Sequence, residues 1–166
     1  MKEKEYMRLE SDSIGTMEVP EDAYYGVQAL RAKENFPITG TKLHPVFIKN
    51  LAKIKRAAAI TNRKAGRLKP EIANAIEASA NEVICGMFDK DFIVDGIQGG
   101  AGTSANMNMN EVIANRAIEM LCGKKGDYTI VHPNDHVNMA QSTNDVIPTA
   151  GKLTVLDLLK PLDKSL

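Results

Sequence analysis

Two polar segments carry the residues of this sequence that could do chemistry, and the first is a glycine-rich run that leads into a helix. Residues 98–106 read Gln-Gly-Gly-Ala-Gly-Thr-Ser-Ala-Asn. Three glycines let the backbone come close to a small ligand, because glycine accepts dihedrals that other residues avoid. Thr103, Ser104 and Asn106 stand at the expected start of a helix, where free N–H groups attract anions. The segment therefore predicts a site for a carboxylate or a phosphate.

The same residues also have a purely structural interpretation, since Thr, Ser and Asn before a helix are ordinary N-caps and glycines make turns. The glycine spacing excludes a dinucleotide-binding fingerprint, and no Gly-Lys-Ser/Thr follows to make a Walker loop. A functional interpretation is favoured because amides replace better helix formers along this helix. We therefore expect something polar to be held by the asparagine series Asn106, Asn108, Asn110 and Asn115.

The second segment, residues 131–150, combines hydroxyls, amides, carboxylates and two histidines. It is too polar for a core strand and too rich in directional hydrogen-bonding groups for a plain linker. Ser142 and Thr143 could simply cap the helix that follows. His136 has no assigned role, and a loop histidine of this kind is more often structural or solvated than catalytic.

Helical periodicity dominates the elements that must position these two segments. A small hairpin is expected within residues 8–20, followed by a helix that is entered at residues 20–22 and carries Tyr24 and Tyr25. Apolar spacing predicts helices from Pro45 to Gly66 and from Pro70 to about Gly86, a helix ending in a left-handed Gly123, and a last helix from Thr149. The basic residues of the 45–66 helix predict a largely solvated face; they are Lys49, Lys53, Lys55, Arg56, Arg63 and Lys64.

Composition sets wide bounds on the class of protein. The chain has 166 residues, 43% of them hydrophobic, which suffices to bury a core. The chain has 21 Lys and Arg residues and 21 Asp and Glu residues, so its formal net charge is zero. We therefore do not expect it to bind nucleic acid or an anionic membrane through its overall charge. The N-terminus lacks a signal-peptide core and no apolar run could cross a bilayer, which predicts a cytoplasmic protein. Cys85 and Cys122 predict buried free thiols rather than a disulfide or a metal site, and we expect no cofactor.

In combination these motifs resemble the aspartase/fumarase superfamily of lyases, over essentially the whole chain as the N-terminal part of such an enzyme. The motifs are the opening at residues 9–36, the glycine loop at 99–104, the run at 106–116, and residues 141–145. Within the superfamily the sequence is most similar to the aspartate ammonia-lyases. Fumarate hydratases usually have different residues where this sequence has Tyr25-Gly26, Ala101 and Ser142-Thr143-Asn144, and Ala101 in place of their serine is the most telling departure.

The resemblance implies a mainly α fold. We expect an N-terminal lyase domain with a small β-hairpin over residues 1–148, and the start of a long helix of a central bundle domain over residues 149–166. The last helix meets no cap or partner, so we expect the chain to be truncated. Family enzymes are homotetramers whose active sites combine segments of three subunits, and their catalytic serine lies far downstream. We therefore expect no catalytic residue in this chain and no turnover by it alone.

The chemistry that the resemblance implies agrees with the residue types. Deamination of aspartate removes a proton beside the β-carboxylate and drives a second negative charge onto it, in an enediolate-like intermediate. Fixed hydroxyl and N–H donors stabilise such a charge as it develops. By resemblance, Thr103, Ser142 and Thr143 hold this carboxylate, and Asn144 reaches the amino group that leaves as ammonia.

Other assignments stay open at this point. By resemblance, His132, Asn134 and Asp135 match a secondary anion-binding loop of the hydratases. The full-length protein could be a fumarate hydratase instead of an ammonia-lyase. It could also be a non-catalytic helical interaction module that keeps only the scaffold.

Overall fold

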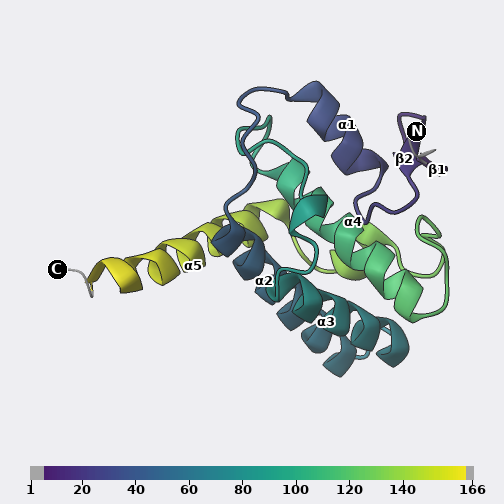
Figure 1. Cartoon of the computed structure of the whole chain (residues 1–166). Coiled ribbons are helices and arrows are strands. Elements are labelled where there is room, and N and C mark those ends of the chain that lie inside the picture. Colours follow the sequence, from purple (N-terminus) through teal and green to yellow (C-terminus); the bar gives the residue numbers. More distant parts are fainter. Residues whose placement is uncertain (1–5, 164–166) are drawn as a thin grey trace.

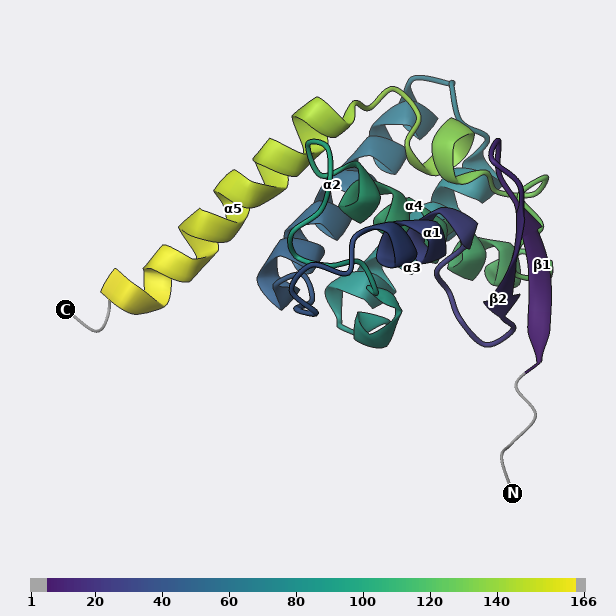
Figure 2. The same cartoon turned by 90° about the horizontal axis from the view of Figure 1, so that it is seen from above.

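A computed structural model describes residues 6–163 and has the predicted mainly helical fold around a central helix. Helix α4 (Thr103–Met120) has α1 (Val27–Asn35) on one side and the adjacent pair α2 (Pro45–Lys64) and α3 (Pro70–Ile84) on another (Figure 1). Helix α5 (Thr143–Asp163) packs mainly on α2 and then leaves the body of the molecule. Its outer end and the N-terminal hairpin lie at opposite ends of the molecule (Figure 2).

The predicted hairpin is confirmed as strands β1 (Met7–Ser11) and β2 (Thr16–Pro20), which pair antiparallel. The Asp12 carboxylate closes the turn by accepting two N–H groups. The buried side chain of Arg8 donates to the carbonyl oxygens of Pro20, Ala23 and Tyr25. One arginine therefore fixes the hairpin to the segment that leads into α1.

Helix α1 begins at Val27, so the prediction of a helix entered at residues 20–22 and carrying Tyr24 and Tyr25 was wrong. Buried carboxylates set this start. Glu111 accepts from the N–H groups of Gly26, Gln28 and Ala29 at 2.9, 2.9 and 3.0 Å, and Glu10 accepts from that of Val27 at 2.9 Å. The first N–H groups of a helix have no partner within it, and a carboxylate also suits the positive end of the helix dipole.

The predicted ends of α2 and α3 are confirmed, because Gly66 and Gly86 both have a positive φ directly after them. At the end of α4 the left-handed residue is Cys122, with φ 62°, and not the expected Gly123. The N–H of Gly123 donates to the Ile118 carbonyl and that of Cys122 to the Glu119 carbonyl, both at 2.9 Å. A β-carbon on Gly123 would collide with Ile130 and Ile118, so packing explains this glycine.

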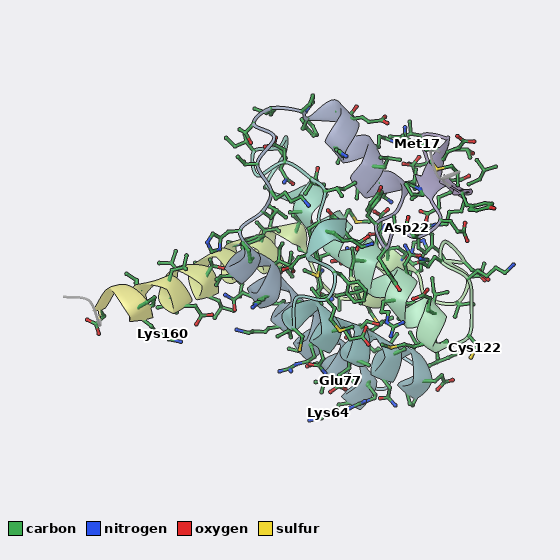
Figure 3. All side chains as sticks on the ribbon, in the orientation of Figure 1. Met17, Asp22, Lys64, Glu77, Cys122 and Lys160 are labelled. Atoms are coloured by element: carbon green, nitrogen blue, oxygen red, sulfur yellow. The ribbon has the colours of Figure 1, made fainter. Side chains whose placement is uncertain are left out.

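Both cysteines are free, as predicted, but they are exposed, so the prediction of buried thiols was wrong. Cys122 lies on the surface at the C-terminal end of α4 (Figure 3). The turn that ends α4 turns this side chain outward. Apolar neighbours in the sequence therefore did not indicate its burial.

Helix α4 is buried on almost every face, and its asparagines fasten the segments around it. Asn108 accepts from the Ile93 N–H and donates to the Asp91 carbonyl, both at 2.9 Å. Asn115 donates to the Tyr24 carbonyl and accepts from the Gly126 N–H. These two amides bind protein backbone. The expectation that the asparagine series holds a ligand therefore no longer extends to Asn108 and Asn115.

Helix α5 begins at Thr143, earlier than the expected Thr149, and continues through Pro148 and Pro161. Each proline removes one N–H from the helix ladder. The Ser142 hydroxyl accepts from the Asn144 N–H at 3.2 Å, which confirms the capping interpretation of Ser142. Large apolar side chains stay exposed along the helix; they are Leu153, Val155, Leu156, Leu158 and Leu159. Across residues 6–163 no helix has the length and apolar character needed to span a membrane.

Candidate functional site

The N-terminal ends of α4 and α5 meet, and this brings the two polar segments together. The Asn106 side-chain nitrogen lies 3.2 Å from the Thr143 hydroxyl oxygen. A β-carbon on Gly102, the residue before α4, would come within 2.8 Å of Ile147 in the first turns of α5. Thr103 and Asn106 are three residues apart on α4 and so share one face of it. Thr103 therefore lies at the same junction as Thr143.

The junction is open to solvent at the residues that were predicted to bind a ligand. Thr103, Ser142 and Asn144 are exposed, and Thr143 is half-buried. The starts of two helices face this junction, and the positive ends of their dipoles attract negative charge. Hydroxyl and amide donors stand beside them. The arrangement suits a small anion such as a carboxylate or a phosphate.

The glycine loop before α4 is held in shape by Gln98 and Asp95. Gln98 accepts from the Ala105 N–H at 2.7 Å and donates to the Asp95 carbonyl at 2.8 Å. The Asp95 carboxylate accepts from Thr39 and from the N–H groups of Gly40 and Ile97. These bonds, the Thr39 hydroxyl first, hold the pKa of Asp95 well below its ordinary value. The Asp95 carboxylate and Gln98 therefore hold the loop in one conformation. A fixed conformation suits a loop whose backbone must meet a ligand in a defined geometry.

A glycine substitution tests how closely the two helix starts are packed. Gly102 has φ 83°, and an alanine there would meet Ile147 as well as adopt a left-handed backbone. Gly100 has φ 72°, but its β-carbon would meet only the Thr103 hydroxyl, at 3.7 Å. We expect Gly100→Ala to cost about 1 to 2 kcal/mol of unfolding free energy and Gly102→Ala about 1 to 3 kcal/mol more. Equal losses in urea unfolding would show that the junction is not tightly packed.

Lys55 contradicts the prediction of a solvated basic face on α2, because its side chain is fully buried. Its ammonium group donates to the Asn138 side-chain oxygen at 2.7 Å. The same oxygen accepts from the Asn106 side chain at 3.2 Å. Burial lowers the pKa of Lys55 to about 7. A polar network of three side chains therefore lies directly beneath Thr143.

The loop of the predicted secondary anion site is built around two histidines. The His132 Nδ1 accepts from the N–H groups of Asn134 and Asp135 at 3.2 and 3.1 Å, and the backbone N–H of His132 donates to the His136 Nδ1 at 2.9 Å. Burial lowers the pKa of His136. Both imidazoles thus have structural roles, while Asn134 and Asp135 are exposed. Anion binding by His132, Asn134 and Asp135 stays a prediction.

The cavity beside this loop has a volume of about 240 Å³. Its lining includes His132 and Asn134, together with the carboxylates of Asp12 and Glu111. The Arg31 guanidinium holds the pKa of Asp12 below its ordinary value, so this carboxylate carries its charge at neutral pH. The Arg31 cation balances the charge of Asp12, so this ion pair leaves no net charge of its own beside the cavity. Within residues 6–163 no three His, Cys, Asp or Glu side chains gather in a way that could hold a metal ion.

The sequence predictions missed the residues that support this junction. Asn138 lay within the polar 131–150 segment but received no role, and Gln98 was considered only as the start of the glycine loop. Lys55 was placed on the wrong face. Its burial had no local signal, because its partner is 83 positions away in the chain. The sequence therefore predicts the candidate hydroxyls of Thr103, Ser142 and Thr143, but not the side chains that support the junction around them.

Proteins of known class match most of this chain. An aspartate ammonia-lyase from a Bacillus species is 55% identical over 156 residues, which cover 94% of this chain and 33% of that protein. A class II fumarate hydratase from Halobacterium salinarum is 55% identical over 152 residues, which cover 92% of this chain and 32% of that protein. A crystal structure described as fumarate lyase:delta crystallin from Brucella melitensis matches with a TM-score of 0.89 and 50% identity, covering 91% of this chain and 36% of that chain.

The matched region includes both polar segments and the junction between them. The chain spans about a third of the length of the curated relatives it matches. A model of the lyase family matches residues 15–166. The chain belongs to this lyase family, the aspartase/fumarase superfamily.

Proposed function

We propose that this chain is the N-terminal part of an aspartate ammonia-lyase, which converts L-aspartate to fumarate and ammonia reversibly. The observation that carries the proposal is that the starts of α4 and α5 meet. There the Asn106 side-chain nitrogen donates a hydrogen bond to the Thr143 hydroxyl oxygen at 3.2 Å. In the proposed site, hydroxyls of Thr103, Ser142 and Thr143 hold the β-carboxylate of aspartate. Two helix dipoles add positive potential at the same place.

The proposed chemistry uses these donors in the transition state. A base supplied by another part of the enzyme takes the proton from the carbon beside the β-carboxylate. The electrons move into that carboxylate, which then carries a second negative charge, and collapse of this intermediate expels ammonia. Donors that are already oriented stabilise the extra charge without reorganising. Asn144, exposed at the start of α5, is proposed to bind the amino group.

The exposed apolar side of α5 supports the proposed place of this chain in a larger enzyme. The helix leaves the body of the molecule (Figures 1 and 2), and five large apolar side chains stay exposed along it. Such a face is buried when helices pack together. We propose that residues 149–166 begin the central bundle of a homotetramer, with residues 1–148 as the N-terminal domain, and that each active site takes segments from three subunits.

A second function is favoured by one specific observation. The Halobacterium salinarum fumarate hydratase is as similar to this chain, at 55% identity, as the Bacillus aspartate ammonia-lyase is. A hydratase would hold the same carboxylate and add water instead of ammonia. Ala101, where hydratases usually have serine, favours the ammonia-lyase.

The full-length protein that carries this chain decides between the two functions. We expect it to consume fumarate only when ammonia is present and to release fumarate from L-aspartate, with none from L-malate. Consumption of fumarate in ammonia-free buffer, with malate as product, would identify a hydratase instead. The 166-residue chain by itself is expected to release no fumarate from aspartate, because the proposed base lies outside it. Measurable release of fumarate by this chain alone would contradict the proposal that the base lies outside it.

A further inference from the structure

Lys55 is among the largest fully buried side chains of the described residues, yet it has no ion pair within residues 6–163. A buried cation without a negative partner is costly to fold. Among the described residues, its side chain has one hydrogen-bond partner, the neutral amide of Asn138, at 2.7 Å. The proposed function leaves this group unused, although the network that it begins ends at Thr143.

The direction of every hydrogen bond in this network follows from Lys55. In its protonated form Lys55 can only donate, and the side-chain oxygen of Asn138 is turned toward it. Its amide nitrogen is then left to donate to the Gln141 carbonyl, at 3.2 Å. The oxygen of Asn138 can only accept, so Asn106 must approach it with its nitrogen, at 3.2 Å.

The direction set at Asn138 continues to the proposed site. The Asn106 nitrogen also lies 3.2 Å from the Thr143 oxygen and donates to it. The Thr143 hydroxyl is therefore an acceptor within the network, and its own proton stays free for another partner. The oxygen of Asn106 is buried and has no hydrogen-bond partner among the described residues.

We infer that Lys55 is a positioning residue for the dicarboxylate substrate: through Asn138 and Asn106 it directs the proton of the Thr143 hydroxyl toward the bound carboxylate. The inference rests on the proposed function. A bound dicarboxylate also brings negative charge near the Lys55 cation, which has no anionic partner within residues 6–163. Lys55 touches no reacting atom in this account, and acts through the two asparagines.

The test is the substitution Lys55→Met in the full-length enzyme, with Lys49→Met as the matched control. Both lysines are on α2, but Lys49 is exposed. We expect Lys55→Met to raise both KM for aspartate and the inhibition constant of succinate, a four-carbon dicarboxylate without an amino group, roughly tenfold or more. The melting temperature should stay equal or rise, since methionine fills the space without a buried charge. Lys49→Met should change neither property.

Asn138→Ala provides a second variant should Lys55→Met fail to fold, and it is also expected to raise the succinate inhibition constant. An unchanged inhibition constant in the folded variants, with an active wild-type enzyme, overturns the inference and leaves the proposed function standing. A lowered melting temperature in Lys55→Met with unchanged KM shows that the lysine is merely structural and also overturns it. A wild-type enzyme that acts on neither aspartate nor fumarate overturns the proposed function, and this inference falls with it.

Discussion

Replacing Thr143 by valine in the full-length enzyme is expected to lower kcat/KM for aspartate by roughly 100- to 1,000-fold, the usual loss when one oriented donor to a developing oxyanion is removed. Valine has nearly the shape of threonine, so the change removes little except the hydroxyl. The loss should fall on both constants: KM rises because the hydroxyl also holds the carboxylate of the bound substrate, and kcat falls because the extra charge on the carboxylate exists only in the transition state. Steady-state rates of fumarate release measure both constants.

Thr149→Val is the matched control for this experiment. Thr149 lies on the same helix, is exposed, and makes no side-chain contact that the proposed chemistry uses. Its kcat/KM should stay within about twofold of the wild-type value, as for most surface substitutions. Near-unchanged turnover in both Thr143→Val and Thr103→Val would instead support a scaffold without catalytic use of these hydroxyls.

Glu111 gives the second large effect, on stability rather than on rate. Its carboxyl group is almost fully buried beside Glu10 and Tyr128, and burial raises its pKa from 4.5 to about 7 although three N–H groups donate to it. Between these two pH values the folded chain binds more protons at this position than the unfolded chain does. This contribution to the unfolding free energy therefore falls as the pH rises from 4.5 through 7.

Glu111→Gln removes this titration and isolates its effect. The difference in unfolding free energy, variant minus wild type, should increase by roughly 3 kcal/mol between pH 4.5 and pH 8, whatever constant cost the new amide adds. Urea unfolding of the 166-residue chain at several pH values measures it. Glu34→Gln, at an exposed position of α1, is the matched control for the loss of one glutamate carboxyl. A flat difference for Glu111→Gln would show that the buried carboxyl keeps its ordinary pKa.

The sequence predicted those parts of the fold that depend on neighbouring residues. Turn residues and periodic apolar positions indicated the hairpin, the ends of α2 and α3, and the helix after the glycine loop. Gly66 and Gly86 succeeded because a left-handed residue after a helix is a local requirement. At α4 the same rule predicted a left-handed Gly123, yet Cys122 takes that conformation. Gly123 is needed for packing instead, because a β-carbon there would collide with Ile118 and Ile130.

Predictions failed where a distant group decides the local structure. Helix α1 starts at Val27 because Glu10 and Glu111 cap it there, and Glu111 is 85 positions from Gly26. The lysine pattern of α2 indicated a solvated face, while the network beneath the site buries Lys55. The prediction that the hydroxyls of residues 103 and 143 act together rests on the resemblance alone, since nothing local in the sequence ties one of these residues to the other.

The most direct measurement of the central claim is a double-mutant cycle of succinate binding to the full-length enzyme, by calorimetry, with Thr103→Val and Thr143→Val. In the proposed site one carboxylate is held by hydroxyls from the starts of both α4 and α5, so each variant should weaken binding. The two losses should also be coupled by about 0.5 kcal/mol or more, as for residues that share a partner. Losses that add to within about 0.3 kcal/mol would contradict the account, because independent sites behave in that way.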